Sequence, residues 1–191
     1  MITQKGKYGM GWIPDYPDFR DYTEKTDDVK QVLGPTGVLK AKSLPASVDL
    51  RNWCSPVEDQ GRLGSCTAHA GAGIIEYYER KSFGRHTDAS RLFLYKVTRN
   101  LMKMSGDTGA FLRRTMGAMV LFGVPPEEYW PYTDDGKGFD REPPAFCYAF
   151  AQNYQTIKYF RHDPPETKAE EVLIRVQTYL SKGHPAMFGF T

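Results

Sequence analysis

The chain has 191 residues, of which 40% are hydrophobic and 25% charged, and its formal net charge is +2. This is the composition of a globular protein, and a charge so close to balance favours neither a nucleic-acid-binding nor a membrane-binding protein. No apolar run approaches the roughly 18 residues of a membrane helix. The opening residues MITQKGKYGMGW lack the apolar centre of a secretory signal peptide, which leaves the compartment open between the cytoplasm and export by another route.

Residues 1–43 differ in composition from the rest of the chain. They are rich in proline, aspartate and aromatic residues and show neither a helical nor a strand period. We therefore predict an irregular N-terminal extension. Because disordered segments are usually poor in aromatic residues, we expect this extension to lie as a strap over another surface. Residues 44–191 are predicted to form a compact domain.

Four helices are predicted within that domain from the spacing of apolar residues, at about 65–81, 89–103, 109–122 and from residue 167 onward. The last has the clearest signals, because Thr167-Lys168-Ala169-Glu170 is a capping-box sequence and Gly183 is a typical stop. Its expected apolar face carries Val172, Leu173, Val176 and Leu180.

Strands are expected at 155–160 and 185–191, on either side of the last helix. The chain would then run through helices first and afterwards through strand, helix and strand. That order indicates an α+β domain.

The three cysteines, Cys54, Cys66 and Cys147, are too few and odd in number for a disulfide framework. Cys54 and Cys147 either pair or are two buried free thiols, and the sequence leaves both possibilities open. No Cys/His cluster has zinc spacing and no glycine-rich loop has phosphate-binding spacing, so we expect neither a metal nor a cofactor.

The stretch PVEDQGRLGSCTAHAG, residues 56–71, places Cys66 at the predicted start of a helix. Free backbone N–H groups and the helix dipole favour a thiolate there. Gly61 and Gly64 permit a tight turn that exposes the sulfur, and the amide of Gln60 is a neutral donor able to bind an oxyanion beside it. The alternative is that Cys66 is a small core residue at the start of a buried helix.

Longer segments resemble the papain-like cysteine proteases. LPASVDLRNW at 44–53 and PVEDQGRLGSCTA at 56–68 are similar to the start of the mature enzymes. DTGAF at 107–111 resembles the family's substrate-binding segment, YWPYT at 129–133 its Tyr-Pro-Tyr turn, and HPAMFGF at 184–190 the strand before its catalytic histidine. The resemblance implies a papain-like fold over 44–191, with a helical half and an incomplete β half.

The resemblance also implies residue roles. Cys66 would be the nucleophile, with Gln60 and the Cys66 N–H as oxyanion donors. Substrate would be bound by Gly64, Ser65, Thr108, Gly109, Phe111 and Gly189. The implied reaction is endopeptidase cleavage of peptide or protein substrates through a thioester that water then hydrolyses.

Two positions depart from the family pattern. Leu63 stands where a disulfide cysteine usually precedes Gly-Ser-Cys, and Thr67 replaces the usual tryptophan. The first change removes a covalent cross-link, which suits a reducing compartment or a bacterial-type relative. Both changes resemble divergent, mostly prokaryotic members, and neither removes the nucleophile.

The catalytic base is the main difficulty. In this family the histidine and asparagine follow the cysteine by about 130–150 residues, at roughly 196–216 in this numbering. We expect them to come from a continuation of the chain or from a second chain. Of the histidines present, His69 and His184 are expected to be packed or loop residues, and His86 and His162 solvated ones.

Residues 1–43 could play the part of a propeptide, as in zymogens of this family. We expect Gly9-Met10-Gly11-Trp12 to dock in the cleft as an inhibitory strap, the alternative being a permanent structural arm. Two other functions remain open on the same fold. One is a catalytically inactive protein that binds peptides or a partner, and the other is a thiol acyltransferase or deamidase.

Overall fold

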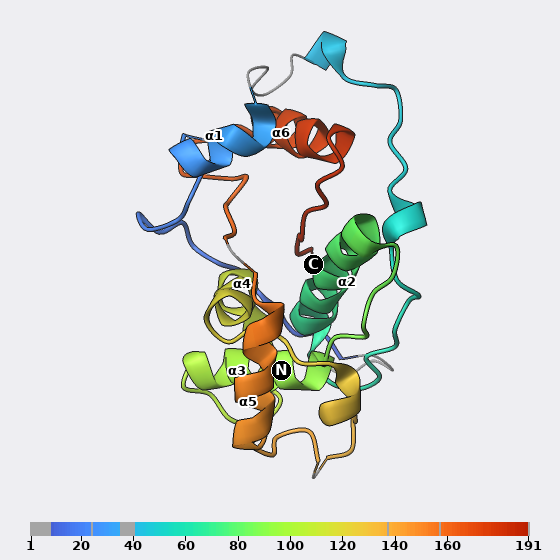
Figure 1. Ribbon diagram of the computed structural model, residues 1–191. Helices are drawn as coiled ribbons and strands as arrows, with labels where there is room; N and C mark the ends of the chain where they lie inside the picture. The colour runs from blue at the N-terminus through green and yellow to red at the C-terminus, as the bar shows by residue number, and fades with distance from the viewer. Residues whose placement is uncertain (1–8, 24, 35–40, 137, 157, 191) are drawn as a thin grey trace. The chain divides into compact units, whose positions relative to one another are not determined.

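A computed structural model describes residues 9–23, 25–34, 41–136, 138–156 and 158–190 (Figure 1). The chain divides into two compact units. Unit 1 comprises Met1–Asp15, Trp53–Ile157 and Met187–Thr191, and unit 2 comprises Tyr16–Asn52 and Lys158–Ala186. Residues of the N-terminal extension therefore occur in both units. Among the described residues, no helix combines the length and the apolar character needed to cross a bilayer.

Unit 1 is built on four helices: α2 (Cys66–Phe83), α3 (Arg91–Leu101), α4 (Leu112–Leu121) and α5 (Ala145–Ala151). Helix α2 packs closely on α3 and α4 because the front half of its sequence consists of small residues. A Cβ added to Gly71 would lie 3.0 Å from both Leu94 Cδ2 and Met119 Sδ. Helix α2 ends at Gly84, whose left-handed backbone (φ 72°) lets its N–H bond to Arg80 O.

Helix α3 forms the centre of the unit 1 core. Its residues from Arg91 to Arg99 are all buried, and the apolar ones among them are at most 2% exposed. The Ser90 hydroxyl caps the helix by accepting a hydrogen bond from Phe93 N at 3.2 Å. Because α3 is packed on all sides, its backbone is held in place, and so are the side chains that extend from it toward the surface.

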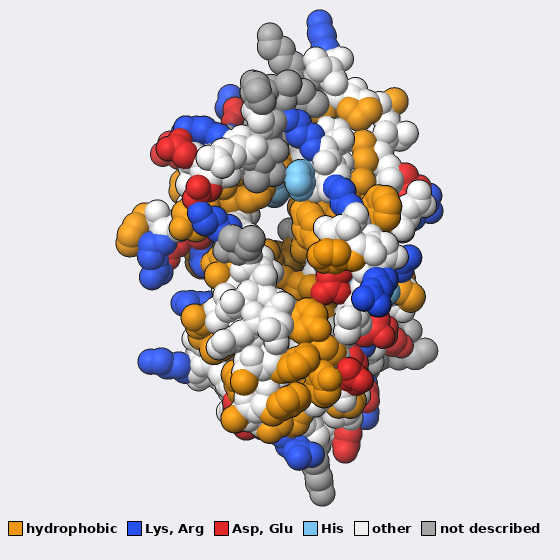
Figure 2. All heavy atoms as spheres, viewed as in Figure 1, with side chains coloured by type: hydrophobic (Ala, Val, Ile, Leu, Met, Phe, Trp, Pro, Cys, Tyr) orange, Lys and Arg blue, Asp and Glu red, His pale blue; other side chains and the backbone are white. Residues whose placement is uncertain are grey.

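Helix α5, with sequence AFCYAFA, was not predicted from the sequence. Its Phe146 and Phe150 stack on each other and contact Tyr129 edge-on, and Phe150 also contacts Tyr154. Figure 2 shows hydrophobic side chains gathered on this face, over α5 and the neighbouring short helix η4 (Glu127–Tyr129). The other short 3-10 helices are η2 (Ala41–Ser43), η3 (Arg51–Trp53) and η5 (Gln152–Tyr154).

The described sheet has two short parallel strands, β1 (Trp12–Ile13) and β2 (Ala110–Phe111), with Trp12 opposite Ala110 and Ile13 opposite Phe111. This corrects two expectations. The N-terminal extension is not wholly irregular, because it supplies β1 and also helix α1. The helix predicted at 109–122 begins only at Leu112, since the two preceding residues pair with β1.

The strands predicted at 155–160 and 185–191 are not strands over their described residues. In the first, Thr156 N donates to Met119 O at 3.2 Å, so this segment bonds to the end of α4 instead of to a neighbouring strand. A strand needs such a neighbour to satisfy its N–H and C=O groups. The helical content and the small sheet agree with the expected α+β class.

Unit 2 contains α1 (Asp27–Leu33) and α6 (Ala169–Ser181), which lie side by side in Figure 1. Val29 and Tyr179 are buried between them, with Phe160 packed against the pair. The capping box predicted for α6 is wrong, because the N-cap is Lys168 and the Thr167 hydroxyl accepts a hydrogen bond from Arg175 Nη1 instead. The expected apolar face is also wrong in part, since Leu173 is exposed.

Candidate active site

Cys66 is the first residue of α2 and is half-buried. Because α2 is 18 residues long, its N-terminal dipole and first-turn N–H groups favour an anion at this end. The preceding Ser65 is the N-cap and is buried. The position is therefore the one expected for a nucleophile that attacks as a thiolate.

The loop before Cys66 holds Gln60 in a defined orientation. Gly61 turns the loop with a left-handed backbone (φ 56°). The Gln60 Nε2 donates one hydrogen bond to Leu63 O at 2.8 Å and another to Gly9 O at 2.9 Å. Both amide hydrogens of the expected oxyanion donor are thus used, one of them by the N-terminal extension.

The Tyr132 hydroxyl forms hydrogen bonds with both ends of this loop, at Gln60 and at Ser65. Its hydroxyl donates to Gln60 O at 2.8 Å and hydrogen-bonds with Ser65 Oγ at 2.7 Å. Tyr132 N donates to Glu127 Oε1 at 2.7 Å, and Glu127 pairs with the buried Arg91 at 3.0 Å. The resemblance of YWPYT to the family motif pointed to this segment, but the contact of Tyr132 with Gln60 and Ser65 was not predicted.

The expected substrate segment lies across from this loop. Gly109 has a left-handed backbone (φ 75°) and is buried, whereas Thr108 is exposed. Phe111 is half-buried in β2 and pairs with Ile13 of the extension. The structure therefore brings Gln60, Ser65 and Gly109 together around the start of α2, and places Thr108 and Phe111 on the same segment.

Residues 9–13 of the extension run between the nucleophile loop and the substrate segment. A Cβ added to Gly11 would lie 1.7 Å from Gly64 O, and one added to Gly109 would lie 2.2 Å from Gly11 O. Gly11 O accepts a hydrogen bond from Ala110 N at 2.7 Å, and Gly9 N donates to Gly61 O at 3.2 Å. The backbones touch so closely that only glycine fits at these positions.

The extension has two further contacts in unit 1. Gly189 lies against the Trp12 indole, since a Cβ on Gly189 would be 2.1 Å from Trp12 Cε2. At the other end, Arg113 N donates to Asp15 Oδ2 at 3.0 Å, and the Arg113 guanidinium pairs with the same carboxylate at 3.3 Å. Gly189 thus meets the extension, and Asp15 fastens the extension to the start of α4.

Within the described residues, no hydrogen bond joins Cys66 to a histidine. His69 lies one turn along α2 from Cys66, but its Nδ1 is 3.1 Å from Ser65 O and its ring lies edge-on to Tyr132. Burial lowers the pKa of His69, which favours a neutral ring. His86 pairs with Asp88 at 3.0 Å, and His162 and His184 belong to unit 2.

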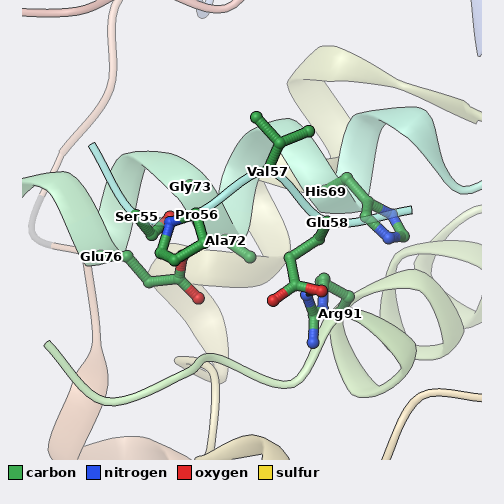
Figure 3. A pocket seen from close by; sticks show the side chains of 9 residues that line it. All are labelled: Ser55, Pro56, Val57, Glu58, His69, Ala72, Gly73, Glu76 and Arg91. Carbon is green, nitrogen blue, oxygen red and sulfur yellow. Dashed lines mark ion pairs between the residues drawn. The ribbon is translucent and has the colours of Figure 1, made fainter. Parts of the chain in front are cut away.

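A cavity of about 230 Å³ lies beside α2, and Cys66 does not line it (Figure 3). Arg91 and Glu58 face each other there and form an ion pair of 2.7 Å, while His69 and Glu76 project from α2. Glu76 is buried and accepts a hydrogen bond from Ala89 N at 2.9 Å, and burial raises its pKa. Arg91 and Glu58 are thus paired with each other and Glu76 is hydrogen-bonded within the protein, which suits a structural role.

No disulfide joins Cys54 to Cys147 among the described residues, and the two are not both buried, because Cys54 is exposed and Cys147 is buried. No cluster of three metal-ligating side chains occurs in the part of the chain that the structure describes.

Comparison with known proteins gives two relatives at the same identity. An uncharacterized peptidase C1-like protein of Acanthamoeba polyphaga mimivirus is 32% identical over 202 residues, which span all of this chain and 63% of the relative. Xylellain, a cysteine protease from Xylella fastidiosa, is 32% identical, with a TM-score of 0.71 over 96% of this chain and 66% of xylellain. This chain belongs to the papain-like cysteine proteases, as a divergent member.

A structure of mite allergens Blo t 1 and Der p 1 shares the papain-like fold at 22% identity, with a TM-score of 0.53 over 71% of this chain and 43% of the allergen chain. No family model matches the chain. The chain spans less than two thirds of the length of the mimivirus protein and about two thirds of the length of xylellain.

Proposed function

We propose that the chain carries the nucleophile of a papain-like thiol endopeptidase. The observation that supports this most directly is the position of Cys66 at the start of α2. In the loop before it, the Gln60 side-chain amide donates to Leu63 O, and the Gln60 backbone carbonyl accepts a hydrogen bond from the Tyr132 hydroxyl. The Cys66 thiolate would attack a peptide carbonyl to form a thioester and release an amine, and water would then release the acid. Gln60 Nε2 and the Cys66 N–H would bind the oxyanion of each tetrahedral intermediate.

The base of this reaction is proposed to lie outside the described residues. His69 Nδ1 is bonded to Ser65, and burial lowers the pKa of His69, which disfavours the imidazolium that would pair with a thiolate. In this proposal the histidine and asparagine come from a segment after residue 191 or from a second chain. Gly64, Ser65, Thr108, Gly109, Phe111 and Gly189 are proposed to bind the peptide.

The extension is proposed to inhibit this site. Gly9 O accepts the hydrogen bond of Gln60 that the oxyanion would need, and Gly11 fills the space between Gly64 and Gly109. A peptide substrate could enter only after residues 9–13 had left. A permanent arm would make the same contacts, so the two roles differ in whether displacing the arm increases activity.

The test is a chimera in which the xylellain segment that follows the matched region is joined after residue 190. Its Cys66 is labelled with iodoacetamide from pH 4 to 9, and casein hydrolysis is assayed on the same preparation. The proposal predicts fast labelling at about pH 5–6, where only a thiolate paired with an imidazolium reacts, and hydrolysis that Cys66→Ala abolishes. In the 191-residue chain alone, labelling at about pH 5–6 should be slow, because the proposed imidazolium is supplied from outside it.

Three results would count against the proposal. Fast labelling of the 191-residue chain at pH 5–6 would mean that the base lies within it. A chimera that labels fast but incorporates amines without hydrolysing casein would be an acyltransferase, whereas slow labelling with peptide binding would indicate the inactive binding protein.

A further inference from the structure

Two backbone N–H groups of the candidate site, those of Gly64 and Gly109, donate hydrogen bonds to two side chains that are bonded to each other, Asp107 and Tyr95. Asp107 Oδ1 accepts hydrogen bonds from Gly64 N at 2.8 Å and from the Tyr95 hydroxyl at 2.7 Å. The Tyr95 oxygen in turn accepts a hydrogen bond from Gly109 N at 3.0 Å. One short relay therefore connects the loop that precedes Cys66 to the segment proposed to bind the substrate.

The relay is anchored in the core. Tyr95 belongs to α3 and its side chain is fully buried. The Arg99 guanidinium lies 4.0 Å from the centre of the Tyr95 ring and forms a 2.7 Å ion pair with Asp140. Burial and the hydrogen bond to Asp107 raise the pKa of Tyr95, so its hydroxyl stays protonated and donates.

The segment after α3 is held by the same group of residues. Arg99 Nη1 donates to Gly106 O, and Gly106 N donates to Asp140 Oδ2 at 2.8 Å. Asp107 lies on an exposed loop, but its Oδ1 is turned toward Tyr95 and Gly64. The position of Asp107 is therefore set by buried partners on both sides of it.

The nucleophile loop and the substrate segment have a second connection, which passes through the extension. Gly11 touches both Gly64 and Gly109, and this contact disappears if the extension leaves. Leu63 offers no thiol for a cross-link to the substrate segment. The Tyr95–Asp107 relay is a side-chain connection that would remain.

We infer that Tyr95 and Asp107 are positioning residues that keep Gly64 and Gly109 in fixed register once the extension is displaced, in place of a covalent cross-link. The reaction needs the oxyanion donors and the bound peptide to be aligned closely, and a displacement of about 1 Å can cost about a hundredfold in rate. The catalytic part of this inference rests on the proposed function, whereas the positioning part does not.

The first experiment measures amide hydrogen exchange by NMR in the 191-residue chain carrying Gly11→Val, because a side chain at Gly11 would clash with Gly64 O and keep residues 9–13 from docking. Tyr95→Phe removes both hydrogen bonds of the hydroxyl and keeps the ring. The matched control is Tyr148→Phe, which removes another tyrosine hydroxyl of unit 1, bonded to Glu142. We expect Tyr95→Phe to increase exchange at Gly64 and Gly109 by about tenfold, with the α3 amides unchanged, and the control to leave Gly64 and Gly109 unchanged.

The second experiment measures peptide hydrolysis in the chimera described above. Tyr95→Phe is expected to lower kcat about tenfold or more with a smaller change in KM, because alignment is lost and not substrate contact. Asp107→Ala should have the same effect, and Asp107→Asn should restore most of the activity, since its amide oxygen can accept both hydrogen bonds.

The two experiments separate failure of this inference from failure of the proposed function. If the wild-type chimera does not hydrolyse peptides, the proposed function is wrong, and the exchange data still decide whether the relay positions the two segments. Unchanged exchange at Gly64 and Gly109 in Tyr95→Phe would overturn the inference. Equal loss of protection throughout α3 would also overturn it, because the hydroxyl would then support the core in general.

Discussion

In the proposed function, the side-chain amide of Gln60 takes part in both catalysis and inhibition. One of its hydrogens orients it on Leu63 O, and the other bonds Gly9 O in the extension. A single donor can serve only one acceptor well, so Gly9 O and an oxyanion exclude each other. Gln60 should therefore matter for catalysis and for holding the extension.

For Gln60→Ala we expect kcat in the chimera to fall about 10²-fold, because one oxyanion donor is lost. The control is Val57→Ala, because the Val57 side chain lies in the same loop and is fully exposed. The measurement is steady-state hydrolysis of a fluorogenic peptide. An unchanged kcat would show that Gln60 is not an oxyanion donor.

His162 in unit 2 is predicted to make stability depend on pH. Burial lowers its pKa to about 4, against about 6.5 in an unfolded chain. As the pH falls from about 6.5 to 4, the unfolded chain gains a proton that the folded unit does not, so up to about 3 kcal/mol of stability is lost. Asp163 opposes the shift and Arg175 adds to it.

The measurement for His162 is the protection of α6 amides against exchange between pH 7 and 4. His162→Phe should remove this part of the pH dependence while keeping the ring contacts with Phe160 and Tyr179. His86→Phe is the control, since His86 lies in the other unit and pairs with Asp88. Equal pH profiles for wild type and His162→Phe would refute the prediction.

For single residues, the sequence predicted those features that depend only on neighbouring residues in the chain. Cys66 lies at a helix start and Gln60 beside it, as the spacing indicated. Tyr95 and Asp107 were not predicted as parts of the site, because their roles depend on contacts with Gly64 and Gly109 that only the folded chain creates. A buried tyrosine at a helical apolar position has the same sequence pattern as an ordinary core residue.

At the scale of elements, the first prediction tests whether the extension inhibits the site. Gly11→Val would place a side chain where even a Cβ lies 1.7 Å from Gly64 O, so residues 9–13 cannot dock. If the extension inhibits, Gly11→Val should increase the rate of Cys66 labelling and of hydrolysis in the chimera at least about fivefold. Met10→Ala is the matched control, because Met10 is 82% exposed. Equal rates in both variants would favour the permanent arm.

The turn that carries Tyr132 depends on a buried ion pair. Arg91 is 6% exposed and binds both Glu58 and Glu127. Arg91→Ala would leave Glu127 without its buried partner, which should cost about 3–5 kcal/mol in the free energy of unfolding. The control is Arg62→Ala, which breaks the exposed pair with Asp134 and should cost less than about 1 kcal/mol. Urea denaturation measures both, and similar losses would contradict the prediction.

Helices and strands could be predicted where the residues of a single segment are enough to determine the secondary structure. Helices α2 and α3 follow apolar spacing and end near the expected residues. The strand predictions were wrong. Strands β1 and β2 pair residues that are far apart in the chain, and the sequence of either segment alone does not reveal its partner. Helix α5 was missed because the dense aromatics of AFCYAFA do not show the 3.6-residue period of a half-buried helix.

For the whole molecule, the α+β class and the papain-like fold were both predicted correctly, and the resemblance of 56–68 to the family carried most of that information. The division into units was not predicted. Unit 2 joins residues of the extension to the segment around α6, and composition alone gives no sign of contact between Val29 and Tyr179. The family resemblance concerned residues 44–191 and said nothing of what the first residues pack against.

The extension is part of the same chain as unit 1, and Gly9 and Gly11 bond to that unit through their backbone groups. If the extension inhibits as proposed, it competes with a substrate as a tethered ligand, at an effective concentration that for short flexible linkers reaches about the millimolar range. A free peptide with the sequence of residues 9–15 would have to be supplied at a similar concentration to replace a deleted extension. An apparent KM measured with the extension present would then report the competition and not the affinity of the cleft.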